Sequence, residues 1–363
     1  MEALCRNQRQ TLWALGFFQY RRVSSAKAQS MERAAAAAFL RSVEQPMKSL
    51  SFELRAIPPF RLDLTAWVLR RRPHNTVDRW DGTSWRRVLV IDDDPLEAAV
   101  TQIGTSEQPR LHVTLSGCRI SQHAKEDAAR RLRQMLGLGI DLSAFYRLAA
   151  RDKRLAPLAH RFRGLKPPRF PSVFEGLVNA VACQQLSLTV GIVILNRLAE
   201  QCGPAVQYGG VMQHAFPQPA DLIRLSPDSL RALGFSFAKA RSLLELGQTA
   251  VAGHLESKEL EKLRDEEVLS LLLSLRGIGR WTAEYVLLRG LGRISVFPGD
   301  DVGARNRLAQ WLGRDQPMNY ETVRSAVRRW HPYCGLVYFH LLLNGLAESG
   351  AISLELGRDL PSA

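Results

Sequence analysis

Residues 275–305, LRGIGRWTAEYVLLRGLGRISVFPGDDVGAR, decide the fold of the chain. Gly277-Ile278-Gly279 lies between two apolar runs with helical spacing, which predicts two helices joined by a tight hairpin. The glycines leave the backbone N–H groups at the start of the second helix accessible, and the helix dipole adds to their attraction for a phosphate. The hairpin therefore predicts contact with a DNA backbone, although a Gly-x-Gly turn also occurs between helices without any ligand.

A second signal follows one helix later. Phe297-Pro298-Gly299 breaks the chain, and Asp300-Asp301 opens a new helical run. An aspartate at a helix N-terminus is favoured by the dipole and stays ionised at neutral pH. Such an aspartate is usually only an N-cap, but after a phosphate-binding hairpin it can also hold a carboxylate beside bound DNA.

Composition sets the wider limits. The chain has 363 residues, 46% of them hydrophobic, a net charge of +14 and a pI near 10.1. These values allow two or three domains with real cores and favour an acidic partner such as nucleic acid. The five cysteines are scattered and form no Cys-x-x-Cys pair, which argues against a disulfide framework, a zinc site and an iron–sulfur cluster. We therefore expect no metal and no cofactor.

The chain divides into three parts. Residues 1–46 are predicted to be a disordered extension, with a true start of translation at Met47 or an organelle transit peptide as open alternatives. Residues 47–140 predict a small α+β domain, with strands at 51–56, 85–91 and 111–115 and helices at 62–72 and 123–136. Residues 141–350 predict an all-helical region without any convincing strand. No apolar run is long enough to span a bilayer, so we expect a cytoplasmic protein, associated with the nucleoid in a bacterium.

Two further segments of the helical region are candidates for DNA contact. Residues 147–169 carry eight Lys or Arg against one acid, which fits either a solvated basic face or a phosphate contact. Gln184-Gln185-Leu186 interrupts a long helical stretch before Ser187, which can cap the next helix. These residues are ordinary surface residues unless the loop faces DNA, where they could fill the stack that a nucleotide leaves.

The sequence closely resembles the helix-hairpin-helix DNA glycosylases, and within them the DNA-3-methyladenine glycosylase II family. The resemblance rests on six colinear segments: FELRAIPPF at 52–60, CQQLS at 183–187, LRALGFSFAKA at 230–240, GIGRWTAEY at 277–285, FPGDDVGAR at 297–305 and WHPY at 330–333. It implies an N-terminal mixed domain followed by an all-helical region in two lobes, with the cleft between the lobes and the hairpin gripping DNA at its edge.

The resemblance also implies roles for single residues. Asp301 matches the family aspartate, with Asp300 as its neighbouring support or cap. The aromatic base pocket falls on Trp281, Tyr285 and Tyr333, and Cys334 stands where the family usually has an arginine. DNA contacts fall on Gly277, Ile278, Gly279 and Arg280 of the hairpin and on Gln184, Gln185 and Leu186, with Gln185 entering the gap of the extruded nucleotide.

These residues predict a specific chemistry. Trp281 occupies the place where bifunctional relatives such as endonuclease III carry a lysine, and indole cannot form the Schiff base that strand cleavage needs. A base alkylated on a ring nitrogen is already cationic and departs without an acid, so one carboxylate is sufficient. We expect a monofunctional glycosylase that acts as a monomer, flips alkylated bases out of double-stranded DNA and leaves an abasic site. The alternatives are a glycosylase for oxidised or mismatched bases and a non-catalytic DNA-binding protein.

Overall fold

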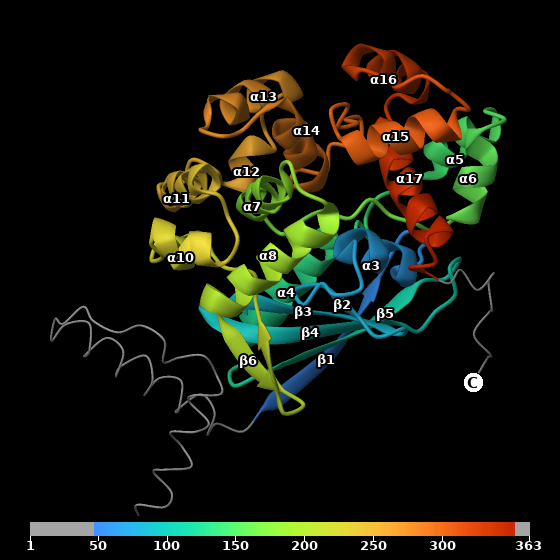
Figure 1. Cartoon of the computed structure of the whole chain (residues 1–363). Coiled ribbons are helices and arrows are strands. Elements are labelled where there is room, and N and C mark those ends of the chain that lie inside the picture. Colours follow the sequence, from blue (N-terminus) through green and yellow to red (C-terminus); the bar gives the residue numbers. More distant parts are fainter. Residues whose placement is uncertain (1–46, 353–363) are drawn as a thin grey trace, which may run out of the picture. The chain divides into compact units, whose positions relative to one another are not determined.

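The computed structural model describes residues 47–352, so the predicted extension at residues 1–46 lies outside the described part of the chain. The first part of this region is a five-stranded antiparallel sheet with the strand order β1-β5-β4-β3-β2 (Figure 1). The strands are β1 (Lys48–Arg55), β2 (Arg79–Trp80), β3 (Ser84–Ile91), β4 (Asp94–Gln102) and β5 (Arg110–Gly117). The three predicted strands are confirmed as β1, β3 and β5.

Two helices complete the mixed domain, α3 (Leu62–Arg70) and α4 (Gln122–Met135). Both bury alanine and leucine side chains in the core of the sheet, which confirms the α+β prediction. On α3, however, Leu64 and Val68 point into a different core, formed with helices from the C-terminal half of the chain. Because α3 has buried residues on two faces, the end of this helix is fixed next to the helical region.

The helical region contains two hydrophobic cores. One lobe holds α7 (Val173–Cys183), α8 (Leu188–Cys202), α9 (Pro219–Leu222), α10 (Pro227–Ala232), α11 (Phe237–Val251), α12 (Ser257–Leu260), α13 (Asp265–Ser274) and α14 (Arg280–Arg289). Its apolar faces follow the helical spacing read in the sequence. The two-lobed prediction is confirmed for the described residues.

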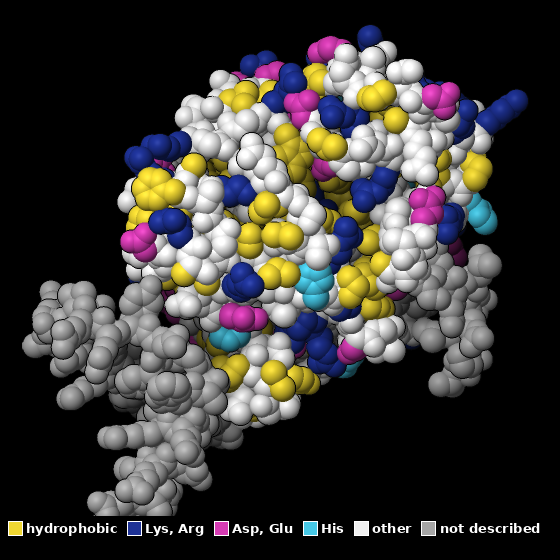
Figure 2. Space-filling view, in the orientation of Figure 1, with side chains coloured by type: hydrophobic (Ala, Val, Ile, Leu, Met, Phe, Trp, Pro, Cys, Tyr) yellow, Lys and Arg dark blue, Asp and Glu magenta, His cyan; other side chains and the backbone are white. Residues whose placement is uncertain are grey.

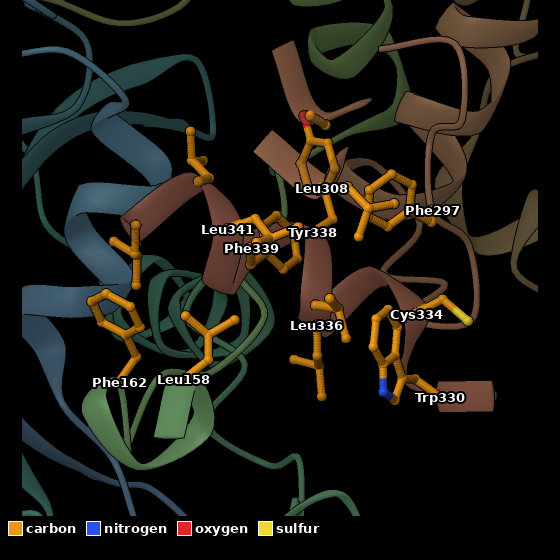
Figure 3. Packing of buried hydrophobic residues seen from close by; sticks show 14 of the residues in the cluster. Leu158, Phe162, Phe297, Leu308, Trp330, Cys334, Leu336, Tyr338, Phe339 and Leu341 are labelled. Atoms are coloured by element: carbon orange, nitrogen blue, oxygen red, sulfur yellow. The ribbon is translucent and has the colours of Figure 1, made fainter. Parts of the chain in front are cut away.

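The other lobe packs around one apolar helix, α17 (Cys334–Glu348), which is surrounded by Leu158, Phe162, Leu308 and Trp330 (Figure 3). Its other helices are α5 (Ser143–Ala150), α6 (Leu155–Arg161), α15 (Val302–Trp311), α16 (Tyr320–Val327) and the 3₁₀ turn η1 (Arg328–Trp330). None of the helices within residues 47–352 combines the length and the apolar character that crossing a membrane requires.

The expectation of no strand after residue 141 is wrong. Strands β6 (Ala205–Tyr208) and β7 (Val211–His214) form an antiparallel hairpin. Gly209 and Gly210 both have positive φ, which suits the two-residue turn of a tight hairpin. Val206 packs with Val88 and Val90 of β3, so the hairpin is stabilised by the N-terminal sheet rather than by its own few hydrogen bonds.

Candidate active site

A cavity of about 810 Å³ opens between the two lobes. It is lined by the loop between α7 and α8, one face of α14, the start of α15, the middle of α17 and the arginines that follow α3. Figure 2 shows the corresponding hollow, with hydrophobic side chains inside it and Lys or Arg side chains beside it. Cationic side chains at the mouth can hold a nucleic-acid backbone outside, and the hydrophobic side chains can hold a base inside.

Asp301 places a carboxylate in this cavity. It is the N-cap of α15, and its Oδ1 accepts a hydrogen bond from the backbone N–H of Ala304 at 2.8 Å. Its Oδ2 accepts from Trp281 Nε1 at 3.3 Å and from the Tyr338 hydroxyl at 3.0 Å. Three donors therefore fix the carboxylate, while the side chain remains half-buried and accessible from the cavity.

Asp300 has a different environment. Its Oδ2 accepts from Arg280 Nε at 2.7 Å, and the guanidinium of Arg280 in turn lies 3.6 Å from the ring centroid of Tyr320. Asp300 also lines the cavity, but its carboxylate is paired with Arg280 at the start of α14. This difference supports Asp301 as the acid that acts in the cavity and Asp300 as its neighbouring support.

The loop before Asp301 is held by Glu284 on α14. One oxygen of Glu284 accepts from the Gly299 backbone N–H at 3.0 Å and the other from the Tyr320 hydroxyl at 2.6 Å. Burial raises the pKa of Glu284, and burial together with the Glu284 carboxylate raises the pKa of Tyr320 to about 12. Because these partners tie the loop to α14, the position of Asp301 is coupled to the helix that carries the aromatic wall.

Trp281 and Tyr285 form that wall. They lie four residues apart on α14, so their rings share one face, with centroids 5.6 Å apart and planes at 37°. Tyr285 is buried, and its hydroxyl accepts a hydrogen bond from Arg71 Nη1 at 3.0 Å. Both rings line the cavity, where they can stack on a flipped base.

The structure does not bring Tyr333 to this wall. Tyr333 precedes the first residue of α17 and packs edge-on against Phe145, with ring centroids 5.7 Å apart. The cavity is lined instead by Tyr338 and Leu342, which lie four residues apart on one face of α17. The WHPY motif thus locates the right helix, but the residues of its first turns face the lobe's core.

Cys334 also lies away from the cavity. Its thiol is buried and donates to the Val327 carbonyl at 3.3 Å. Burial raises the pKa of this thiol to about 11, so the group is neutral at physiological pH. At the position of the expected arginine, this chain therefore has no charge for DNA or base contact.

The hairpin joins α13 to α14 as expected. Gly277 has a φ of +76°, and Gly279 is the N-cap of α14. Ile278 is buried in the core of its lobe, so it anchors the turn, while Arg280 is exposed. The first N–H groups of α14 have no carbonyl within the helix to bind, which leaves a site for a phosphate.

The Gln184 side chain braces this hairpin. Its Nε2 donates to the Gly277 carbonyl at 2.9 Å and to Thr282 Oγ1 at 3.0 Å. Gln185 and Leu186 are exposed at the mouth of the cavity, and Gln185 has the left-handed φ of +56°. The geometry therefore separates the adjacent glutamines: the first holds the hairpin, and the second projects outward, where it can enter a DNA stack.

The cavity residues that were not predicted from the sequence include Arg71, Arg289 and Tyr338. A signal for Arg71 was present, since three consecutive arginines end α3 immediately before Pro73. Arg71 adopts a left-handed φ of +62°, which turns the chain at the end of the helix. Arg289 and Tyr338 lie on apolar helical faces and have no distinguishing spacing.

Two family models match the chain, AlkA N-terminal domain over residues 51–172 and HhH-GPD superfamily base excision DNA repair protein over residues 178–332. The DNA-3-methyladenine glycosylase of Bacillus subtilis (strain 168) is 30% identical over 227 residues, which are 61% of this chain and 75% of the relative. The chain belongs to the DNA-3-methyladenine glycosylase family.

Further similarities agree with this assignment. DNA-3-methyladenine glycosylase 2 of Escherichia coli (strain K12) is 26% identical over 284 residues, covering 78% of this chain and 94% of the relative. The 3-methyladenine DNA-glycosylase from Archaeoglobus fulgidus superposes with a TM-score of 0.72 at 27% identity, covering 84% of this chain and 99% of that one. As a member of the DNA-3-methyladenine glycosylase family, the chain is a DNA glycosylase of base excision repair.

Proposed function

We propose that this glycosylase is monofunctional, acts as a monomer on duplex DNA and removes alkylated purines of the 3-methyladenine and 7-methylguanine type. The observation that carries the proposal is the position of Asp301. Its Oδ2 lies 3.3 Å from the indole nitrogen of Trp281, and both side chains line a cavity of about 810 Å³. A fixed carboxylate beside a flat aromatic wall suits a reaction in which a flipped base leaves a sugar that becomes positively charged.

The residues divide the reaction between them. The start of α14 binds a phosphate, Gln185 fills the stack, and Trp281 and Tyr285 hold the extruded base. Asp301 then stabilises the oxocarbenium-like sugar as the bond to the base breaks, and it orients the water that completes hydrolysis. A ring-alkylated purine departs as a neutral base after taking the bonding electrons, so the leaving group needs no proton.

The absence of lyase chemistry is part of the proposal. None of the described residues lining the cavity is a lysine. The ammonium group of Lys239, on α11, donates hydrogen bonds to the backbone carbonyls of Ala182 at 3.3 Å and Gln184 at 2.6 Å. Because a Schiff base requires a free amine at the sugar, Trp281 supports hydrolysis by water and release of an intact strand with an abasic site.

The test uses the full chain and a duplex methylated with dimethyl sulfate, from which free 3-methyladenine and 7-methylguanine are measured. We expect release by the wild type and a loss of about 100-fold or more in Asp301→Asn, since removing a group that stabilises transition-state charge has effects of this size. Asn is as good an N-cap as Asp, so α15 should remain folded. Asp300→Asn is the matched control, with a much smaller loss.

The other possible results would each contradict a different part of the proposed function. Full activity of Asp301→Asn would overturn the catalytic assignment. No release by the wild type would leave a DNA-binding protein without this activity, and cutting of the strand without added base would contradict the monofunctional mechanism. Sedimentation of the active protein at twice the mass of one chain would contradict the monomer.

A further inference from the structure

Two buried arginines line the inner part of the cavity. Arg71 follows α3 and is 4% exposed, and Arg289 ends α14 and is 1% exposed. Both guanidinium groups lie near the ring of Phe170, at 5.5 and 5.0 Å from its centroid. The sheet domain and the hairpin lobe thus each contribute one cation to the same end of the cavity.

Their hydrogen bonds leave donors unused. Arg71 donates to the Tyr285 hydroxyl at 3.0 Å and to Asn179 Oδ1 at 2.5 Å, and its Nε has no partner. Arg289 donates from Nη2 to the Val68 carbonyl at 2.7 Å, whereas its Nε and Nη1 are buried without a partner. These nitrogens have almost no accessible surface, so an acceptor on a ligand reaches them only when the guanidinium shifts toward the cavity. Because a buried donor without an acceptor is costly, a ligand that offers an acceptor favours this shift.

The charges around the arginines do not cancel. The neighbouring carboxylates Asp78 and Glu175 both pair with a third buried arginine, Arg87, at 3.0 and 2.6 Å. Three buried guanidinium groups therefore face two carboxylates, and guanidinium groups remain protonated in proteins. Tyr338 faces Arg289 as a neutral hydroxyl, because burial and the Asp301 carboxylate raise its pKa well above its usual value. One positive charge thus remains among these five groups, before the Asp301 carboxylate elsewhere in the cavity is counted.

We propose that Arg71 and Arg289 form a cationic floor that determines which alkylated base the cavity prefers. The inference rests on the proposed function and adds the chemical class of the substrate. Alkylated guanine carries a carbonyl oxygen on its ring, which accepts a charge-assisted hydrogen bond from a guanidinium N–H.

Alkylated adenine has the opposite properties. Its exocyclic amino group is a donor and meets the donors of the floor, so it gains no such hydrogen bond and leaves desolvated donors without an acceptor. The aromatic wall alone would favour both cationic rings equally. The floor therefore shifts the preference toward 7-methylguanine and away from 3-methyladenine.

The experiment measures both bases released from one preparation of duplex methylated with dimethyl sulfate, so that their ratio is independent of enzyme concentration. For Arg71→Met we expect the ratio of the 7-methylguanine rate to the 3-methyladenine rate to fall about tenfold, which corresponds to about 1.4 kcal/mol. Arg71→Lys keeps the charge and should retain most of the ratio. Arg293→Met is the matched control, because Arg293 is a partly buried arginine outside the cavity.

Circular dichroism establishes whether Arg71→Met folds. If it does not, inhibition of the wild type by the free bases decides: 7-methylguanine should inhibit at a lower concentration than 3-methyladenine. An unchanged ratio in a folded Arg71→Met, or stronger inhibition by 3-methyladenine, would overturn the cationic floor while leaving the proposed function intact. Failure of the wild type to release either base would instead remove the proposed function itself.

Discussion

Trp281 and Tyr338 donate hydrogen bonds to the same oxygen of Asp301, Oδ2, from two different helices. The indole nitrogen lies 3.3 Å away on α14, and the hydroxyl lies 3.0 Å away on α17. Since Oδ1 caps α15, the carboxylate is held by three helices at once. Burial and the nearby Asp301 carboxylate keep the pKa of Tyr338 well above its usual value, so its hydroxyl remains a donor at alkaline pH.

Replacing Tyr338 by Phe should lower the single-turnover excision rate by about tenfold to 100-fold, because a misplaced carboxylate stabilises the sugar cation less well. Affinity for DNA with an abasic-site analogue should change little, since Tyr338 lies inside the cavity. Tyr333→Phe is the matched control and should be nearly silent. Equal losses in the two variants would show that the Asp301 contact is unimportant.

The two hairpin glycines should respond differently to alanine. Gly277 has a φ of +76°, and an added Cβ would lie 2.4 Å from Ser242 Oγ. We expect Gly277→Ala to destabilise the protein by about 1–2 kcal/mol, the cost of a left-handed residue, and to weaken DNA binding. Gly279 has ordinary dihedrals and open space around the added Cβ, so Gly279→Ala should change the free energy of unfolding by less than about 0.5 kcal/mol. Urea unfolding of both variants checks this, and equal destabilisation would contradict the geometry.

The sequence predicted the elements whose residues are close in the chain. Helical spacing and capping rules were sufficient to put Trp281 and Tyr285 on one helix and Asp301 at the start of another, whereas their roles were implied by the family resemblance. Tyr333 was misplaced because its direction depends on where α17 begins. Tyr338, five residues later, is on the face that meets Asp301, and only the packing of the two lobes defines that face.

Long-range contacts were the other limit. Arg71 reaches Tyr285, 214 residues away, and no local pattern reports such a contact. The hairpin of β6 and β7 is different, because its Gly209-Gly210 turn was visible in the sequence. It was missed because strands this short are stable only on another sheet, and the contact of Val206 with Val88 and Val90 is again remote.

Gln185 offers a test in which backbone and side chain can be separated. Its φ of +56° is strained for glutamine and natural for glycine, so Gln185→Gly should be at least as stable as the wild type. The rate at which this variant excises a base from fully paired duplex should nevertheless fall by about tenfold, because nothing then fills the gap in the stack. The fall should be smaller for a mismatched base, which unstacks easily. Gln185→Asn, which also tolerates this φ, should be intermediate. If Gln185→Gly excised bases from both duplexes at the wild-type rate, the Gln185 side chain would have no role in filling the stack.

His340 should make the protein sensitive to acid. It is fully buried between Phe145 and Phe162, with Nδ1 2.7 Å from the Leu336 carbonyl, and burial lowers its pKa from 6.5 to about 4. In the unfolded chain the imidazole is protonated as the pH falls through its ordinary pKa, whereas in the folded protein it is protonated only near pH 4. The unfolded state therefore binds more protons between these values, and stability falls as the pH falls through that window.

The size of this effect follows from the shift. A pKa lowered by about 2.5 units corresponds to about 3 kcal/mol of stability, present above pH 6.5 and lost by about pH 4. Leucine at position 340 cannot be protonated. Between about pH 7 and about pH 4, the free energy of unfolding of His340→Leu should therefore fall by about 3 kcal/mol less than that of the wild type. Urea unfolding at a series of pH values measures both curves. Parallel curves would mean that the buried imidazole is not the acid-sensitive group and that the carboxylates alone determine the acid limit.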